Sequence, residues 1–405
     1  MYKKHLSGIS LLVLFVLIVF SCKKEVASSK NESELSSQAA AKMKAPTASM
    51  SVFSTGFNNP RGLEFSPDGI LYVAEAGVGG GTHSTVGTSC EQVPSPVGPY
   101  MGNPTGGRVS KVTMAGVRTT VTNQIPTSQN AMGDIVGAAD VAFLKNTLYV
   151  LVTAGGCSHG LPDIPSGVYK INRNGSTSLI ADLSVYQRAH PVAQPEEDDF
   201  EPDGSWYSIN SVNGKLYAME ANHGEMVRVS TNGSVNRVID ISASQGHIVP
   251  TVFDFKKSSA DDEDDDWHNS NHRGNAFDSR EGDEQPNFFI GNLSTFPITG
   301  NSKILKLTGG GHLQTVADGL STILGLVVGK NSWIYVLENT VGYPFPTPGS
   351  GKIIAISPSG QKTVLISGLN FPTGMTMGPD GNLYVSNWGF GKPPGGGEIV
   401  KVKLQ

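Results

Sequence analysis

Two stretches at opposite ends of this chain align with each other without a gap. One begins at Gly56 and reads GFNNPRGLEFSPDGILYVAEAG, and the other begins at Gly368 and reads GLNFPTGMTMGPDGNLYVSNWG. Such self-similarity marks a repeat architecture. In each copy a Pro-Asp-Gly turn separates a short apolar segment from Leu-Tyr-Val, which is the pattern of a β-hairpin. The repeated unit is therefore predicted to be built on a hairpin.

Four more degenerate copies lie between these two stretches, which makes six in all. Each copy is followed by a third apolar strand, and the first five continue into a glycine-containing turn and a fourth strand. Four strands per repeat form the blade of a β-propeller, so the sequence predicts an all-β, six-bladed β-propeller. The second strands of the four degenerate copies fall at 148–150, 216–218, 288–290 and 334–336.

The sixth copy reaches Gln405 without an outer strand of its own. The segment 50–55, before the first copy, resembles the outer-strand segment 363–367. We therefore expect an N-terminal outer strand to complete the last blade, which would close the ring and remove exposed sheet edges. The 49 glycines, 24 prolines and 16% charged residues agree with many short strands joined by turns.

The N-terminus is typical of an export signal. Lys3 and Lys4 precede the apolar run 9–20, which is too short to span a bilayer comfortably. The run ends in Val-Phe-Ser-Cys, which resembles a lipobox with Cys22 as the lipidated residue; an ordinary signal peptide cut nearby is the alternative. We expect a signal peptide over 1–22, a flexible tether over 23–49 and the propeller over 50–405. The predicted location is the cell envelope, as a lipoprotein of the periplasm, outer membrane or cell surface that touches the membrane only through its anchor.

The net charge restricts the classes of partner. A net charge of -5 and a pI near 6.0 argue against nucleic-acid binding, which needs a basic face. The chain is expected to be a monomer.

Cys90 and Cys157 fall in long loops of neighbouring blades, and an exported compartment permits a disulfide between them. Spacing alone leaves both the bonded and the free state open.

The long insertions fall mostly on one face of the predicted ring. Because strands alternate in direction, the connections between second and third strands emerge at the same end as the blade-to-blade connections. We expect this loop-rich face to bind a small molecule, a glycan or a protein. The insertions span 76–106, 154–166, 293–302, 339–351 and 388–397, and their aromatic residues include Tyr100, Phe296, Tyr343, Phe345, Trp388 and Phe390.

Five of the six copies place a polar side chain directly after the second strand. One interpretation is a ring of ligands at the channel mouth, with the carboxylates Glu75, Glu220 and Glu338 as metal ligands and Ca²⁺ in the central channel. The other is structural, because such side chains often bond to nearby backbone amides. Repetition in nearly every blade favours the structural interpretation. The five residues are Glu75, Glu220, Asn292, Glu338 and Asn387.

Polar residues that do not repeat are better candidates for a ligand site. Arg61, Asp140 and Asp203 are predicted at the starts of inner strands, and His223 follows Glu220 closely. The acidic run 261–266, near His268 and His272, matches no EF-hand spacing and is interpreted as a solvated, mobile insertion, with weak Ca²⁺ binding as the alternative.

The terminal repeats, together with TFPITGNSKILKL and LENTVGYPFPTPGSGKIIAIS, resemble the ScyD/ScyE family of secreted bacterial propellers over most of 50–405. The resemblance implies the fold and an exported location but no reaction. Members of that family commonly carry His-Asp where this chain has Ala139-Asp140. Shorter pieces are similar to NHL-repeat, TolB-like, gluconolactonase-type and sorbosone dehydrogenase-type propellers, and fold alone does not fix function.

Two functions are consistent with this sequence. The first is a non-catalytic binding module at the cell envelope, since no catalytic motif stands in a usable context. The second is an enzyme, either a metal-dependent lactonase or hydrolase, or one similar to quinone-dependent sugar dehydrogenases. Glu64 is the only carboxylate within the first inner strand, and its direction cannot be deduced from the alternation around it.

Overall fold

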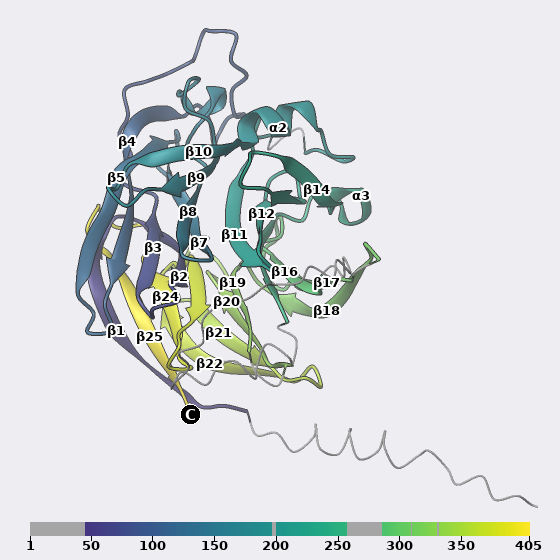
Figure 1. Cartoon of the computed structure of the whole chain (residues 1–405). Coiled ribbons are helices and arrows are strands. Elements are labelled where there is room, and N and C mark those ends of the chain that lie inside the picture. The colour runs from purple at the N-terminus through teal and green to yellow at the C-terminus, as the bar shows by residue number, and fades with distance from the viewer. Residues whose placement is uncertain (1–44, 197–199, 257–285, 309, 330–331) are drawn as a thin grey trace, which may run out of the picture. The chain divides into compact units, whose positions relative to one another are not determined.

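The computed structural model describes residues 45–196, 200–256, 286–308, 310–329 and 332–405. Cys22, the predicted signal peptide, most of the predicted tether and the acidic run 261–266 lie outside these residues. The described chain forms six antiparallel sheets, and the innermost strand of each contacts the innermost strands of its two neighbours (Figure 1). These are the blades of a six-bladed β-propeller, which confirms the predicted fold class.

The tight hairpin between the first two strands of a blade follows from its turn residues. In blade 1, Gly69 has φ of 79°, and in blade 6 the equivalent Gly381 has φ of 72°. Only glycine adopts this left-handed region without a steric cost. The Ser66 hydroxyl also donates to Asp68 at 2.5 Å and so fixes the first of these turns.

The first two strands of each blade follow the predicted hairpins, and the third strand adds to the second. Blade 1 has a fifth, two-residue strand. The strands of blades 1 to 3 are β2 (Pro60–Phe65), β3 (Leu71–Glu75), β4 (Met101–Val112), β5 (Arg118–Gln129) and β6 (Ile135–Val136); β7 (Ala138–Leu144), β8 (Thr147–Val152), β9 (Gly167–Ile171) and β10 (Thr177–Asp182); and β11 (Trp206–Val212), β12 (Lys215–Glu220), β13 (Glu225–Val229) and β14 (Val235–Asp240).

Blades 4 and 5 have four strands each that are consecutive in the sequence, whereas blade 6 takes its outer strand from the N-terminal side of the propeller. The strands of these three blades are β15 (Pro250–Phe255), β16 (Phe288–Asn292), β17 (Ser302–Leu307) and β18 (Leu313–Leu320); β19 (Ile323–Val328), β20 (Ile334–Glu338), β21 (Gly351–Ile356) and β22 (Lys362–Leu369); and β23 (Gly374–Met377), β24 (Leu383–Asn387), β25 (Gly397–Leu404) and β1 (Ala48–Phe57).

The ring is closed as the sequence predicts. Strand β1 pairs antiparallel with β25, from Ala48 opposite Leu404 to Phe57 opposite Gly397. Figure 1 shows the purple β1 running beside the yellow β25. The first and last segments of the propeller thus share one sheet, and blade 6 cannot form completely without both.

Helical segments between the strands were not foreseen from the sequence. A 3-10 turn, η1, spans Cys157–His159, and two short α-helices, α2 (Leu183–Ala189) and α3 (Ser242–Gln245), follow the outer strands of blades 2 and 3. The side chain of Asp182 caps α2 by accepting a hydrogen bond from the Val185 backbone N–H. This N–H lies in the first turn and has no acceptor within the helix. Within the described residues, no helix is both long and apolar enough to cross a membrane.

The two ends of the propeller differ in what they carry. Inner strands begin at the loop-rich end and run towards the hairpin turns, so Pro60 lies near the loop-rich end and Phe65 near the other. Because Ala48 pairs with Leu404, the last residue of β25, the chain enters the propeller at the hairpin-turn end. The two faces are called below the loop-rich face and the hairpin-turn face.

Candidate functional site

The repeated polar residues after the second strands are buried and bonded to the backbone. In four of the five, the side-chain oxygen accepts a backbone N–H from the segment that leads into the same blade. Asn292 bonds to the equivalent segment by donating its amide to the Ile248 carbonyl at 2.8 Å. The other four bonds run from Asn58 to Glu75 at 2.6 Å, Ser205 to Glu220 at 2.6 Å, Ser321 to Glu338 at 2.9 Å and Asn370 to Asn387 at 2.7 Å.

Further hydrogen bonds and ion pairs use most of the remaining hydrogen-bonding capacity of these side chains. Glu75 accepts from Arg108 and Ser110, and Glu338 pairs with Lys352 at 3.0 Å. Asn387 donates to Glu398 at 2.8 Å. A metal at Glu75, Glu220 or Glu338 would have to displace backbone N–H groups that are buried or half-buried, which is costly. The geometry therefore supports the structural interpretation of this ring.

Glu220 also borders His223, whose Nδ1 lies 3.3 Å from Oε1 of Glu220. Burial alone would lower the pKa of His223, but the carboxylates of Glu220, Glu225 and Glu201 outweigh it and raise that pKa above its usual value. The ring of Phe200 packs edge-on against His223 at 5.0 Å. His223 thus belongs to a packed, charged layer in blade 3.

The inner strands enclose a central cavity of about 1420 Å³. It reaches the surface between the hairpin turns at 66–69 and 378–381, and therefore opens on the hairpin-turn face. At its inner end Tyr207 extends from blade 3 towards blade 6, where its hydroxyl lies 3.5 Å from the Thr373 carbonyl oxygen. A single tyrosine therefore crosses the channel between opposite blades.

Four carboxylates line this cavity, and three of them each tie their own inner strand to that of the next blade. Glu64 accepts the Phe143 N–H at 2.8 Å, Asp140 the Ile209 N–H at 3.0 Å, and Asp254 the Val328 N–H at 2.7 Å. Neighbouring inner strands do not pair as a sheet, so these contacts satisfy backbone groups that would otherwise face the channel. The direction of Glu64, ambiguous in the sequence, is therefore towards blade 2.

Asp140 has a perturbed pKa. Burial raises the pKa of its carboxyl to about 7, even though hydrogen bonds from the Ile209 and Val141 backbone act in the opposite direction. Gly62 makes room for it, because a Cβ on that glycine would lie only 1.8 Å from Oδ1 of Asp140. The sequence pointed to Asp140 as a ligand contact, and the structure gives it a position that joins blades 2 and 3.

This perturbation predicts a pH dependence of stability. A carboxyl whose pKa is higher in the folded chain stabilises the fold at low pH, and this stabilisation is lost as the pH rises from the unfolded value of 3.8 through about 7. Between pH 5 and pH 8 in urea unfolding, the wild type should lose on the order of 1–3 kcal/mol more stability than Asp140→Asn. Asp163→Asn, at an exposed loop position, is the control and should follow the wild type. Parallel curves for Asp140→Asn and the wild type would contradict the assignment.

Arg61 lies at the closed end of the channel, next to Gly62 of the cavity wall. Its guanidinium donates to the Ile135 carbonyl at 2.7 Å. Burial lowers the pKa of Arg61, while Tyr207, Asp134 and Tyr100 act to raise it. Arg61 and Tyr207 together separate the central cavity from the loop-rich face.

Asp203 is placed differently from the prediction. It precedes β11, in the turn before Trp206, and is fully buried. Its Oδ2 accepts both the backbone N–H and the hydroxyl of Ser158 at 2.7 Å, and Arg188 pairs with Oδ1. Asp203 therefore holds the 3-10 turn of blade 2 against blade 3 and faces no cavity that we identify among the described residues.

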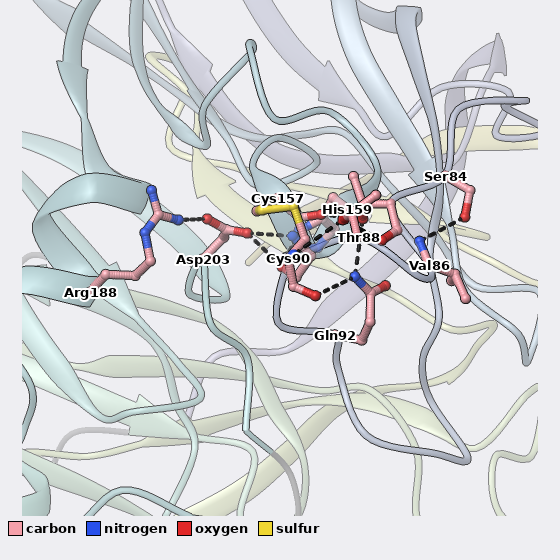
Figure 2. Close-up of a disulfide and its surroundings, with 11 residues drawn as sticks. Ser84, Val86, Thr88, Cys90, Gln92, Cys157, His159, Arg188 and Asp203 are labelled. Atoms are coloured by element: carbon pink, nitrogen blue, oxygen red, sulfur yellow. Dashed lines mark hydrogen bonds and ion pairs between the residues drawn. A yellow bond between two sulfur atoms is a disulfide. The ribbon is translucent and has the colours of Figure 1, made fainter.

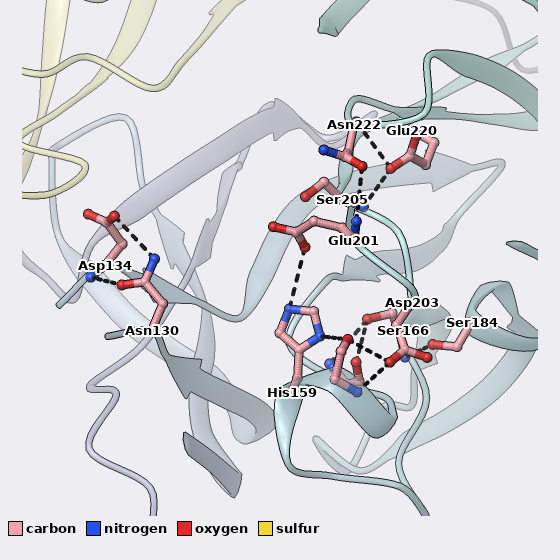
Figure 3. Close-up of polar contacts among 12 residues, drawn as sticks. Asn130, Asp134, His159, Ser166, Ser184, Glu201, Asp203, Ser205, Glu220 and Asn222 are labelled. Carbon is pink, nitrogen blue, oxygen red and sulfur yellow. Dashed lines mark hydrogen bonds and ion pairs between the residues drawn. The ribbon is translucent and has the colours of Figure 1, made fainter. Parts of the chain in front are cut away.

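Next to Asp203 stands His159, which the sequence analysis did not single out. Its Nδ1 lies 3.2 Å from the Ser158 hydroxyl and its Nε2 lies 3.9 Å from Oε2 of Glu201 (Figure 3). Burial lowers the pKa of His159 to about 4, against the opposing effect of Asp203. The cluster has a serine, a histidine and an aspartate, but Ser158 and His159 are almost completely buried, so a substrate could not reach them.

Cys157, at the start of the same 3-10 turn, is bonded to Cys90 in the structure, with their Cα atoms 5.3 Å apart (Figure 2). The ring of Tyr100 packs on His159 at 4.5 Å. The long loop of blade 1 is thus fixed to blade 2 covalently and through aromatic packing. The proximity of His159 to a cysteine in the sequence was the one signal that could have pointed to this cluster.

Trp388, the last predicted ligand candidate, lies on the loop-rich face in blade 6. Its ring stands edge-on to Phe371 at 5.8 Å, and Lys392 lies over it at 4.4 Å. Trp388 does not border the central cavity. Within the part of the chain that the structure describes, no three His, Cys, Asp or Glu side chains are placed to hold a metal ion.

Comparison with known proteins supports the fold and leaves the chemistry open. The chain resembles a protein from Thermus thermophilus assigned as an oxidoreductase (glucose dehydrogenase), with a TM-score of 0.51 and 14% identity over 88% of this chain and 100% of that one. It also resembles a gluconolactonase from Xanthomonas campestris, with a TM-score of 0.50 and 10% identity over 90% and 96% of the two chains. At such identities the likeness shows the propeller fold alone. No protein-family profile matches the sequence, and neither does any curated protein.

Proposed function

We propose that this protein is an exported, lipid-anchored propeller of the ScyD/ScyE type, which acts as a binding module and holds a small molecule in its central cavity. The observation that carries the proposal is the cavity of about 1420 Å³, open at one face and narrowed by Tyr207 at the other. Concave sites enclosed by several elements are where proteins bind small molecules. The sequence resemblance supports the family and Cys22 the anchor.

Two further observations support this location and orientation. A bond between Cys90 and Cys157 suits an oxidising compartment such as the cell envelope. The chain enters the propeller at Ala48 on the hairpin-turn face, the same face on which the cavity opens. A chain anchored at Cys22 would therefore enter the propeller on the face that holds the cavity mouth.

The lining of the cavity indicates the chemistry of its ligand. Its walls carry apolar side chains such as Ile209, Leu326 and Met375, and its carboxylates Glu64, Asp140 and Asp254 already accept backbone N–H groups. Four carboxylates, with Asp68 as the fourth, and one cation, Lys256, line the cavity, so an anionic ligand would meet a mainly acidic wall, which is unfavourable. We therefore expect a mainly apolar ligand that is neutral or cationic.

A fluorescence titration with Nile red, an uncharged apolar dye, tests this function on the full chain in mild detergent. Asn210 lines the cavity from β11, so Asn210→Trp should place a large ring inside it and raise the dissociation constant about tenfold. Asn236→Trp, on the outer strand of the same blade, is the matched control and should bind like the wild type. Bromophenol blue, an anionic dye, should bind at least about tenfold more weakly than Nile red.

Equal Nile red affinity in Asn210→Trp and Asn236→Trp would overturn the proposed site, provided that both variants unfold at the wild-type temperature.

The enzyme alternative is tested separately. Hydrolysis of gluconolactone in the presence of Ca²⁺ or Zn²⁺, or dye reduction with added quinone cofactor and glucose, would replace the binding function by a catalytic one.

A further inference from the structure

A cluster of exposed aromatic rings stands on the loop-rich face, away from the central cavity. Phe296 is 65% exposed, Tyr343 is 90% exposed and Phe345 is 37% exposed. They lie on two loops, 293–301 between β16 and β17 and 339–350 between β20 and β21. Large apolar side chains that cluster on a surface mark a binding site more often than a lone exposed residue does.

The two loops come from neighbouring blades and are fixed to each other. The rings of Phe296 and Phe345 meet edge to face at 5.3 Å, and the Gly342 N–H donates to the Thr299 hydroxyl at 3.3 Å. Aromatic pairs in this geometry attract one another beyond the area that they bury. The rings are therefore held at a defined spacing.

The loop that carries Tyr343 is also stiffened from within. Thr340 and Ser350, at its two ends, have their hydroxyls 2.8 Å apart. The Thr347 N–H donates to the Thr340 hydroxyl at 3.1 Å, and the Ser350 hydroxyl donates to the Thr347 carbonyl at 2.7 Å. A preorganised loop loses less conformational entropy on binding. The loop that carries Tyr343 is therefore ordered before a ligand binds.

Neither loop contains Asp, Glu, Lys, Arg or His. Beside the rings stand hydroxyl and amide side chains, among them Thr295, Thr299 and Asn301. This surface has no charge to attract an ionic partner, and it combines flat apolar rings with uncharged hydrogen-bonding groups. A sugar ring has the matching chemistry, because its C–H faces are apolar and its edge carries hydroxyls.

We propose that the loops 293–301 and 339–350 form a binding site for a neutral polysaccharide, in which Phe296 and Tyr343 stack against successive or adjacent sugar rings. The lack of charge favours a neutral glycan over an acidic one. Hydroxyl-bearing residues between the rings favour a glycan over a lipid surface, which would prefer a continuous apolar patch with basic residues around it. The site is separate from the central cavity, and the two bind independently.

Affinity gel electrophoresis of the full chain through dextran, mannan, galactomannan or hydroxyethyl cellulose tests this proposal. At least one of these neutral polysaccharides should retard the wild type. Tyr343→Ala and Phe296→Ala should each raise the dissociation constant about tenfold, since each removes one stacking platform. Met132→Ala is the matched control, because Met132 is 64% exposed on the same face in blade 1 and should leave the retardation unchanged.

The outcomes separate this site from the cavity and from a protein partner. Asn210→Trp, which obstructs the cavity, should be retarded like the wild type. Retardation by none of the four polysaccharides, equal behaviour of Tyr343→Ala and Met132→Ala, or retardation only by anionic alginate would overturn the proposal. Cross-linking of a protein through Tyr343 without any polysaccharide retardation would overturn it as well.

Discussion

Replacing Phe57 by alanine is expected to lower the free energy of unfolding by about 3–5 kcal/mol. Phe57 ends β1 and is fully buried. It packs in one core cluster with Leu71 of blade 1 and with Tyr384 and Ile399 of blade 6. The truncation would therefore leave a cavity at the junction of the first and last blades. Urea unfolding followed by tryptophan fluorescence measures the effect.

Val52→Ala is the matched control for the closing strand. Val52 lies on the same strand and is 56% exposed, so the change should alter stability by no more than about 0.5 kcal/mol. The contrast separates side-chain packing at the junction from a general effect on β1. A loss below about 1 kcal/mol for Phe57→Ala would show that β1 does not hold the ring closed.

The fold was predictable because its signals are local and repeated. The turn at Gly69 recurs at Gly381, and each demands a positive φ, so the hairpins could be located without tertiary information. The closing strand could be predicted because blade 6 lacked its own outer strand, while 50–55 resembled one; β1 begins two residues earlier, at Ala48. The two-residue β6 of blade 1 was missed because its pairing depends on Ser128 and Gln129, on a strand that extends beyond the blade.

The candidate site was predictable only in part, because side-chain direction is a tertiary property. The sequence showed a polar residue after five second strands, but only the structure shows that Glu75 turns towards the Asn58 N–H. The sequence predicted a binding face on the long loops, and it held no sign of the cavity that opens at the hairpin turns. Tyr207 narrows the other end: its long side chain crosses the channel towards Thr373, and Arg61 of blade 1 stands at the equivalent position of its own inner strand. No repeat pattern could have indicated a residue that acts by breaking the repeat.

The disulfide between Cys90 and Cys157 should have the second large effect. It closes a separation of 67 residues in the sequence. In the chain-entropy description, a cross-link over such a loop restricts the unfolded chain enough to stabilise the fold by about 4 kcal/mol. In the folded state other contacts also hold the loop of blade 1 on blade 2. Thr85 donates to the Cys157 carbonyl at 2.6 Å, and Tyr100 packs on His159. Most of the effect should therefore arise in the unfolded state.

The double variant Cys90→Ser/Cys157→Ser is accordingly expected to unfold at lower urea concentration, with a loss of about 2–5 kcal/mol, while its circular dichroism spectrum stays that of the wild type. Wild-type protein in dithiothreitol should lose the same amount, which controls for the serine side chains. Dithiothreitol should have no effect on the double variant. If the reduced wild type were as stable as the oxidised protein, the cross-link would not restrict the unfolded chain, and the contacts of Thr85 and Tyr100 would be sufficient to hold the loop on blade 2.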